Sequence, residues 1–328
     1  MEPIQDRYSR AIDYMRISVI DRCNLRCVYC MPAGGVRPAG RKGILSCEEI
    51  IRVVGVAAGL GVRKIRITGG EPLIRKDLPY LIASISGMEK IEDISLTTNG
   101  LLLEGLARPL AEAGLKRVNI SLDSLSRDKY REITRGGDIS RVMEGIRQAG
   151  EAGLLPIKIN VVPIRGFNDG EIEGFARLTL RMPYYVRFIE FMPIGAQEMW
   201  SSDKYISMDE IKDRISAIAP LSPVEIRKSG PAKYFRFGNA PGAIGFISPV
   251  THHFCSSCNR LRLTADGKLR PCLFSETEID LKSAMRRGAS DGEIERLIRL
   301  SIEVKPQGHS IDCGKGSPPL KPMSKIGG

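Results

Sequence analysis

The sequence predicts an α/β protein built on an incomplete (β/α)6 TIM-like barrel, followed by a C-terminal α+β appendage that closes the open side of the barrel. Two observations support this fold. Six short apolar runs alternate with amphipathic stretches over residues 1–195, and several runs are apolar at nearly every position. Such runs are typical of parallel strands that are covered on both faces. After residue 195 the alternation stops, and shorter β-like runs mix with helical patterns.

These patterns divide the chain into three regions. We expect the barrel over residues 1–195 and the appendage over residues 196–305. Residues 306–328 are rich in Gly, Pro, Lys and Ser, and therefore predict a flexible tail that ends in Gly-Gly.

The six predicted barrel strands are mainly apolar and are followed by polar or glycine-containing motifs. They span Met15–Ile20, Lys64–Thr68, Asp93–Thr97, Arg117–Leu122, Ile157–Val162 and Val186–Phe191. A capping box formed by Ser46 and Glu49 begins the first crossover helix, and Gly61 is placed to end it. Further helical periodicity covers Leu78–Ile85, Leu102–Ala113, Arg141–Ala152 and Glu171–Arg181.

The appendage contains both kinds of element, with a hairpin turn predicted at Ala265–Gly267. Its predicted strands are Tyr234–Phe237, Ala243–Ser248, Arg260–Leu263 and Lys268–Pro271, and its predicted helices are Met208–Ile218, Ile279–Arg287 and Asp291–Glu303.

Composition limits the class of protein. The 328 residues are 42% hydrophobic, no apolar run reaches the length of about 20 residues that spans a bilayer, and the charged start Met1–Arg10 lacks a signal-peptide core. We therefore expect a cytoplasmic protein. The net charge of +11 favours an anionic ligand. Because the arginines are scattered and no aromatic residues are interleaved with them, a small phosphorylated ligand is favoured over a nucleic acid.

Three cysteines follow the first predicted strand in the order Cys23-x3-Cys27-x2-Cys30. This spacing on a short loop suits a cubane iron–sulfur cluster, which is normally held by cysteine sulfur. Three ligands leave one iron free to bind a small molecule. A structural zinc site is the alternative, but it requires four ligands and no fourth lies nearby. The loop stands at the C-terminal end of its strand, where barrel enzymes place their active sites.

A second set of three cysteines lies in the appendage: Cys255, Cys258 and Cys272. A zinc site is one interpretation, with His252 or His253 as the fourth ligand. A second iron–sulfur cluster with an open iron is the other, and the first cysteine set favours it. The remaining Cys47 and Cys313 are expected to be bystanders.

Polar motifs follow the other barrel strands at Gly69–Pro72, Thr97–Gly100, Ser121–Ser124 and Glu190–Pro193. Four cations lie on predicted strands among apolar neighbours: Arg16, Arg66, Lys158 and Arg187. A buried charge is unfavourable unless it is paired. A triphosphate would pair well with guanidinium groups, and buried salt bridges to Asp or Glu are the alternative.

The first cysteine motif, with Tyr29 before its last cysteine, resembles the radical S-adenosylmethionine (SAM) superfamily. The whole pattern from about Tyr14 onward resembles the GTP 3′,8-cyclases of molybdenum cofactor biosynthesis. The motifs that carry the narrower resemblance are Ile67–Pro72, Thr97–Gly100, both cysteine sets, Asn259–Arg262 and the ending Met323–Gly328. The segment Asp312–Pro319 departs from the stretch expected before that ending.

The resemblance implies a lyase with two 4Fe–4S clusters and SAM as cofactors. SAM would bind the cluster of Cys23, Cys27 and Cys30, and one electron would cleave SAM to a 5′-deoxyadenosyl radical. That radical would take the hydrogen from ribose C3′ of GTP, and the carbon radical would attack guanine C8 to give 3′,8-cyclo-7,8-dihydro-GTP. The open iron of the second cluster would hold the guanine base.

The resemblance also assigns ligand contacts residue by residue. The implied SAM contacts are Tyr29, Gly70, Ser121 and Met192. The implied GTP contacts are Arg16, Arg66, Thr97, Lys158, Arg260, Leu261 and Arg262, and we add Arg187 from its place on an apolar strand. Gly327 and Gly328 are expected to reach into the pocket and, through the terminal carboxylate, to touch Arg16.

The implied partners are GTP, a flavodoxin- or ferredoxin-type one-electron donor and the downstream cyclic pyranopterin monophosphate synthase. The pattern predicts no membrane or nucleic-acid partner and is compatible with a homodimer. Two other functions compete. A radical SAM peptide-modifying maturase with an auxiliary cluster needs no triphosphate site, so Arg260–Arg262 count against it. A nucleic-acid-binding protein with a cluster or zinc is suggested by the pI of about 9.3, but its charges are scattered.

Overall fold

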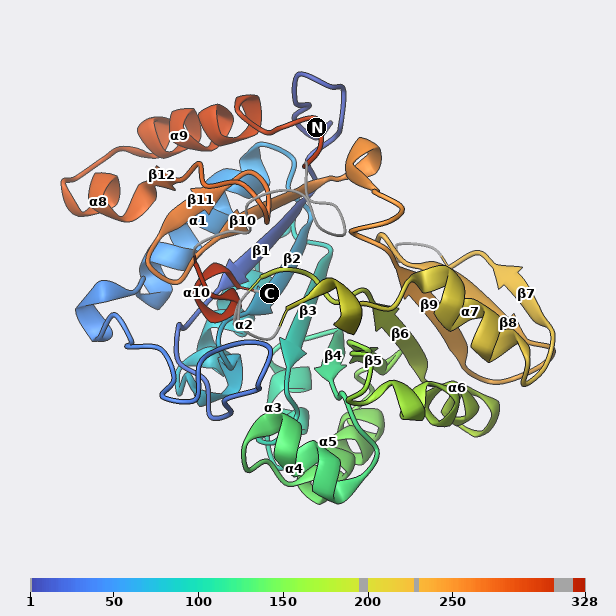
Figure 1. Cartoon of the computed structure of the whole chain (residues 1–328). Helices are drawn as coiled ribbons and strands as arrows, with labels where there is room; N and C mark the ends of the chain where they lie inside the picture. The colour runs from blue at the N-terminus through green and yellow to red at the C-terminus, as the bar shows by residue number, and fades with distance from the viewer. Residues whose placement is uncertain (1, 195–199, 227–229, 310–320, 328) are drawn as a thin grey trace.

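The computed structural model describes residues 2–194, 200–226, 230–309 and 321–327 (Figure 1). Six consecutive parallel strands form an open barrel wall, as the sequence predicts. They are β1 (Tyr14–Ser18), β2 (Lys64–Thr68), β3 (Asp93–Thr98), β4 (Arg117–Ser121), β5 (Lys158–Val161) and β6 (Tyr185–Ile189). The incomplete barrel is therefore confirmed. The expected boundary near residue 195 falls within 195–199, outside the described residues.

Six helices connect and cover these strands. They are α1 (Cys47–Gly59), α2 (Leu78–Ser86), α3 (Ala107–Glu112), α4 (Arg127–Thr134), α5 (Ile139–Glu151) and α6 (Ile172–Arg181). The predicted capping box is present, because Ser46 Oγ accepts from the backbone N–H of Glu49 and the Glu49 carboxylate accepts from the N–H of Ser46. Gly61 follows α1 with φ of 98°, and a Cβ there would lie 2.4 Å from the Cα of Pro3.

Two predicted helices begin later in the structure. The stretch Leu102–Ala113 becomes the shorter α3, because Gly105 adopts φ of 75°, outside the helical range. The stretch Ile279–Arg287 divides into β12 (Ile279–Asp280) and α8 (Leu281–Arg286). Asp280 is the N-cap of α8, where its carboxylate accepts from the backbone N–H of Ser283 at 2.9 Å.

The appendage adds strands to both edges of the barrel wall. In the 12-stranded sheet, β10 (Arg260–Leu263) pairs in parallel with β1, and β9 (Ala243–Ile247) pairs in parallel with β6. The sheet continues outward through antiparallel partners on each side. These outer strands are β11 (Lys268–Arg270) and β12 beyond β10, with β8 (Lys233–Phe237) and β7 (Leu221–Val224) beyond β9.

The appended helices cover the outside of the same sheet. Helix α9 (Asp291–Glu303) packs on α1, α8 packs on α9, and α7 (Met208–Ser216) packs on α6. Helix α10 (Met323–Ile326) lies instead near the mouth of the barrel (Figure 1). Among the helices of the described ranges, none is both long enough and apolar enough to cross a membrane.

The two-residue period of the strands separates the core from the barrel interior. In β1, Met15 and Ile17 are fully buried in the hydrophobic core, whereas Arg16 lines the interior cavity. In β2, Ile67 is likewise fully buried, whereas Arg66 lines the cavity. This alternation places polar side chains inside the wall without interrupting the apolar layer between sheet and helices.

Candidate active site

One cavity of about 340 Å³ brings together both cysteine sets and most of the predicted ligand contacts. The predicted residues that line it are Arg16, Cys23, Cys27, Tyr29, Cys30, Arg66, Gly70, Thr97, Ser121, Arg187, Met192, Cys255, Cys258, Arg260, Arg262 and Cys272. Three predicted residues do not line it. Leu261 is fully buried in the core, and Lys158 and Gly327 lie nearby. Gly328 is outside the described residues.

The first cysteine loop is held against the end of β2. Gly70 donates its backbone N–H to the carbonyl of Ile20 at 2.7 Å, and Glu71 donates its own to the carbonyl of Arg22 at 2.8 Å. A Cβ on Gly70 would lie 2.1 Å from the Arg22 carbonyl oxygen. Only glycine therefore lets the cysteine loop approach this closely.

The three thiols of this loop lie close together in a buried environment. Burial raises the pKa of Cys27 well above its ordinary value, and neighbouring Cys30 and Asp123 raise it further. Burial and the nearby Cys23 raise the pKa of Cys30 to about 12. Three adjacent thiolates without a cation are thus unfavourable here. Bound iron ions would stabilise the thiolates, so the donor set fits an iron–sulfur cluster.

Two buried carboxylates flank the first cysteine set. Glu71 accepts from Thr98 Oγ1 at 2.7 Å and from the backbone N–H of Asn99 at 2.8 Å, and burial raises its pKa to about 7 despite these bonds. Asp123 accepts from the hydroxyl of Tyr29, and burial raises the pKa of Asp123 to about 6. From the sequence, both carboxylates are recognised only as members of strand-end motifs.

Cations line the opposite part of the cavity. Arg262, Arg16 and Arg66 stand in register on the neighbouring strands β10, β1 and β2. Burial lowers the pKa of Arg16 to about 10, and the nearby Arg66 and Arg260 contribute to this shift. Three adjacent guanidinium groups create a strong positive potential inside the barrel.

The buried-salt-bridge interpretation of these cations finds no support within the described ranges. There, no carboxylate oxygen lies within 4.0 Å of a side-chain nitrogen of Arg16, Arg66, Arg187, Arg260 or Arg262. The Nε atoms of Arg16 and Arg187 are buried and have no hydrogen-bond partner there. An anionic ligand would satisfy these groups.

Lys158 belongs to the same positive cluster but is not among the residues that line the cavity. Burial lowers its pKa to about 7, and the nearby Arg187 and Arg117 lower it further. Arg187 is held by Asn119, whose side-chain oxygen accepts from Nη2 at 2.7 Å. Asn119 carried no sequence signal, because it is a single polar residue within a predicted strand.

The second cysteine set lies among cations. Burial opposes ionisation of Cys258, but Arg260 and Lys305 outweigh it and lower the pKa of this thiol to about 6. Lys305 donates to the backbone carbonyls of Arg260 at 2.8 Å and Pro271 at 2.7 Å. Lys305 follows α9, and no motif in the sequence indicates that it reaches this site.

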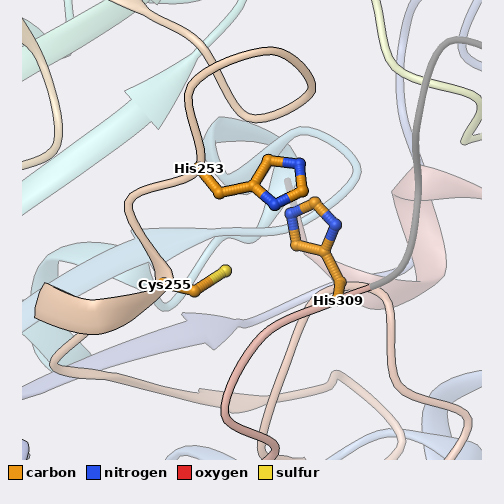
Figure 2. A group of neighbouring side chains, drawn as sticks. All are labelled: His253, Cys255 and His309. Carbon is orange, nitrogen blue, oxygen red and sulfur yellow. The ribbon is translucent and has the colours of Figure 1, made fainter.

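Two histidines approach Cys255, and only one of them was expected. The ligand atoms of His253, Cys255 and His309 all lie within 4.8 Å of one another (Figure 2). Burial, together with His253, lowers the pKa of His309 to about 4. His252 is exposed, and its Nε2 lies 3.1 Å from the carboxylate of Asp209. Of the two histidines considered from the sequence, it is therefore His253 that lies beside the cysteine.

The described end of the tail lies between the two cysteine sets. Met323 and Ser324 line the cavity, and the backbone N–H of Ser324 donates to the sulfur of Cys30. The carbonyl of Gly327 accepts from Nη1 of Arg262 at 2.9 Å. Gly327 has φ of 82°, and a Cβ on it would lie 2.8 Å from the Cβ of Ser18.

Comparisons with known proteins agree with this organisation. The pattern of the Radical SAM superfamily matches residues 17–179, and that of Molybdenum Cofactor Synthesis C matches residues 184–311. A GTP 3′,8-cyclase of Thermodesulfovibrio yellowstonii is 54% identical over 99% of this chain and 100% of its own length. A GTP 3′,8-cyclase of Pelotomaculum thermopropionicum is 53% identical with the same coverage.

Solved structures share the fold at much lower identity. Streptococcus suis SuiB bound to S-adenosylmethionine aligns with a TM-score of 0.59 and 15% identity, over 87% of this chain and 67% of that one. This likeness concerns the fold alone, whereas the curated relatives match over their full length. Radical SAM enzymes use a 4Fe–4S cluster and SAM, and the first cysteine set fits that cluster. On this evidence the chain belongs to the GTP 3′,8-cyclase family of radical SAM enzymes.

Proposed function

We propose that this chain converts GTP to 3′,8-cyclo-7,8-dihydro-GTP in molybdenum cofactor biosynthesis. The observation that carries the proposal is the polarity of one cavity. Three thiols with two buried carboxylates line one part of it, and three thiols with a row of arginines that have no carboxylate partner among the described residues line the other. A cationic cofactor and an anionic substrate would each meet a complementary environment. Full-length identity to proteins named GTP 3′,8-cyclase supports the same conclusion.

The SAM site is proposed beside Cys23, Cys27 and Cys30. When bound, the cluster and SAM supply the 5′-deoxyadenosyl radical that abstracts the C3′ hydrogen. The chain's own residues would position the cofactor, and Tyr29, Gly70, Ser121 and Met192 all line the cavity. The hydrogen bond from Tyr29 to Asp123 holds the tyrosine ring in place. Glu71 and Asp123 provide negative charge for the sulfonium and ammonium groups of SAM.

The triphosphate site is proposed along the arginine row. Arg16, Arg66 and Arg262 would bind phosphate oxygens through charge-assisted hydrogen bonds, with Arg187 and Arg260 beside them. Lys158 would act through the electrostatic potential, because it does not line the cavity. Thr97 also lines the cavity and would contact the nucleoside. Leu261 would support its neighbours from the core.

A second cluster is proposed on Cys255, Cys258 and Cys272, with an open iron that holds guanine. The lowered pKa of Cys258 supports a metal-binding thiolate at neutral pH. Gly327 and Gly328 are proposed to complete the pocket. Gly327 contacts Arg262, which is the register neighbour of Arg16, so a terminal carboxylate near Arg16 agrees with this placement.

The further partners remain part of this proposal. Cleavage of SAM requires one electron, which a flavodoxin- or ferredoxin-type donor would supply. The cyclic nucleotide would pass to a cyclic pyranopterin monophosphate synthase. We further propose that the protein acts in the cytoplasm, as a monomer or homodimer, without a nucleic-acid partner.

The proposal is tested with the full chain, prepared without oxygen and reconstituted with iron and sulfide. Incubation with GTP, SAM and a strong reductant should yield the cyclic nucleotide and 5′-deoxyadenosine, measured by chromatography with mass spectrometry. ATP in place of GTP should give no cyclic product. Formation of 5′-deoxyadenosine without conversion of GTP would retain the radical SAM assignment but overturn the cyclase assignment.

A further inference from the structure

The cluster of His253, Cys255 and His309 is not explained by the cyclase chemistry. Figure 2 shows the two imidazole rings facing each other, with the thiol of Cys255 directed toward them. His253 and Cys255 belong to the loop after β9, whereas His309 follows α9. The fold therefore brings together three potential ligands from two distant segments.

The spacing of these ligand atoms is close to what a single ion requires. Zinc binds sulfur at about 2.3 Å and nitrogen at about 2.1 Å in a tetrahedral arrangement, so two such ligands on one ion lie about 3.6 Å apart. The three atoms here already lie within 4.8 Å of one another. Because His253 is exposed, its side chain can move closer to the other two ligands without disturbing the core.

His309 is prepared as a ligand. Its ring donates a hydrogen bond to the backbone carbonyl of Pro249, which orients the imidazole. Metal-binding histidines typically donate their other ring N–H to such a carbonyl, which fixes the tautomer. The ring is also held between His253 and Phe274, with centroid distances of 4.3 Å to each. The imidazole of His309 is thus held beside His253 and Cys255.

The sulfur of Cys255 is part of the same arrangement. It accepts a hydrogen bond from the backbone N–H of His309, which ties the two ligand-bearing segments together. The carbonyl of Cys255 accepts from Arg10 at 2.8 Å, so the backbone at this cysteine is anchored from the other side. These contacts order the site before any metal arrives.

We propose that His253, Cys255 and His309 bind one divalent transition-metal ion, best matched by Zn²⁺, when the second cysteine set carries no cluster. Binding replaces the thiol proton of Cys255, which is released to solvent, and the two imidazoles donate lone pairs without any change of oxidation state. A water molecule would complete the tetrahedral coordination.

This ion would exclude a cluster from the second set, because both require Cys255. That consequence rests on the proposed second cluster, whereas the ion site itself does not. The site would hold a single ion in protein that has lost, or not yet received, its C-terminal cluster.

The direct test is a Co²⁺ titration of cluster-free, oxygen-free full-length protein. Cys23, Cys27 and Cys30 are replaced by Ser in this protein, so that the first set cannot bind the probe. We expect one Co²⁺ per chain, with thiolate-to-cobalt and tetrahedral absorption bands, and displacement by Zn²⁺.

Variants in the same background identify the ligands. His309→Ala and His253→Ala should each weaken Co²⁺ binding by more than about 100-fold, beyond the 10–100-fold typical for losing an outer-shell partner. His252→Ala is the matched control and should bind as the parent does, since His252 contacts Asp209 instead. Cys258→Ser should also bind as the parent does. Loss of binding in Cys258→Ser with full binding in both histidine variants would assign the ion to the three cysteines and overturn the proposal.

A competition experiment separates this proposal from the proposed function. Zn²⁺-loaded protein should resist iron incorporation into the second set, whereas His309→Ala exposed to the same Zn²⁺ should accept it. If Cys255, Cys258 and Cys272 never take up iron but Co²⁺ still binds through both histidines, the proposed ion site is supported and the proposed second cluster is overturned. Circular dichroism and thermal melting confirm that each variant is folded.

Discussion

The two cysteine sets are similar in number and face one cavity, yet their surroundings are opposite. The N-terminal set lies beside the carboxylates of Glu71 and Asp123. The C-terminal set lies beside Arg260 and Lys305. Three thiols alone therefore do not define what a site binds. The charges around the thiols also determine which ligand is favoured. Here they favour a cationic ligand beside the N-terminal set and an anionic ligand beside the C-terminal set.

The same difference affects the thiols themselves. Burial and the nearby Cys23 raise the pKa of Cys30 to about 12, so it remains protonated in the metal-free protein. Burial also acts against ionisation of Cys258, but Arg260 and Lys305 lower its pKa to about 6. The C-terminal set therefore offers a thiolate to an incoming metal at neutral pH, whereas the N-terminal set must release its protons as metal binds.

The largest expected effect comes from removing one cysteine of each set. Cys27→Ala should abolish 5′-deoxyadenosine formation, because it removes a proposed ligand of the SAM-cleaving cluster. Cys258→Ala should abolish GTP cyclisation while the N-terminal cluster still assembles, as measured by iron content and electron paramagnetic resonance.

Cys47→Ala is the matched control, since this buried thiol contacts Arg75 and Asp77 away from the cavity. Undiminished cyclisation by the Cys258→Ala protein would show that the C-terminal cysteine set is not needed for the conversion of GTP.

Deleting Gly327 and Gly328 should lower the cyclisation rate by about 100-fold, because catalysis tolerates little misplacement of reacting groups. The loss should appear in kcat, while the melting temperature, iron content and SAM binding stay near parental values. Adding two alanines after Gly328 provides a second variant with an altered end. A truncated protein with full activity would remove the tail from the proposed pocket.

Replacing an arginine of the row should weaken GTP binding by one to two orders of magnitude. Charge-assisted hydrogen bonds are worth roughly 1.5–3 kcal/mol each, which corresponds to that change in Kd. Arg16→Ala and Arg66→Ala should both show it in calorimetry, and Arg299→Ala should not, because Arg299 pairs with Glu295 on an exposed helix face. Equal affinity of the parent for guanosine and GTP would contradict a triphosphate site.

The smallest effect concerns the pH at which the thiols react. In metal-free protein, alkylation of Cys258 should increase as the pH rises through about 6 and level off above it, because the thiolate is the reactive form. Cys30 should remain unreactive until strongly alkaline pH. Arg260→Ala should shift the Cys258 profile upward, as read by peptide mass spectrometry. An unchanged profile would mean that Arg260 does not set the acidity of this thiol.

Sequence patterns sufficed for features that depend on local order. The barrel strands follow from apolar runs, and α1 follows from Ser46 and Glu49. Helix α4 was missed because its buried side chains are only Tyr130, Ile133 and Thr134 within a polar stretch. These three residues have helical spacing, but the charged residues around them make the stretch resemble a solvated loop.

The site itself was only partly predictable because its contacts are distant in sequence. Arg16 and Arg66 could be selected as charges on apolar strands, but their register with Arg262 depends on the pairing of β1 with β10. Lys305 and His309 follow a helix and reach the site only through tertiary packing. No local sequence motif distinguishes such residues from ordinary polar positions.

The addition of β9 and β10 to opposite edges of the wall bears on how this chain could be divided. A fragment ending near residue 194 would leave the hydrogen-bonding groups of β1 and β6 unpaired along two long edges. Exposed parallel edges of this kind recruit other chains, so such a fragment should aggregate. The two family patterns meet between residues 179 and 184, yet that junction separates sequence regions rather than independently soluble pieces.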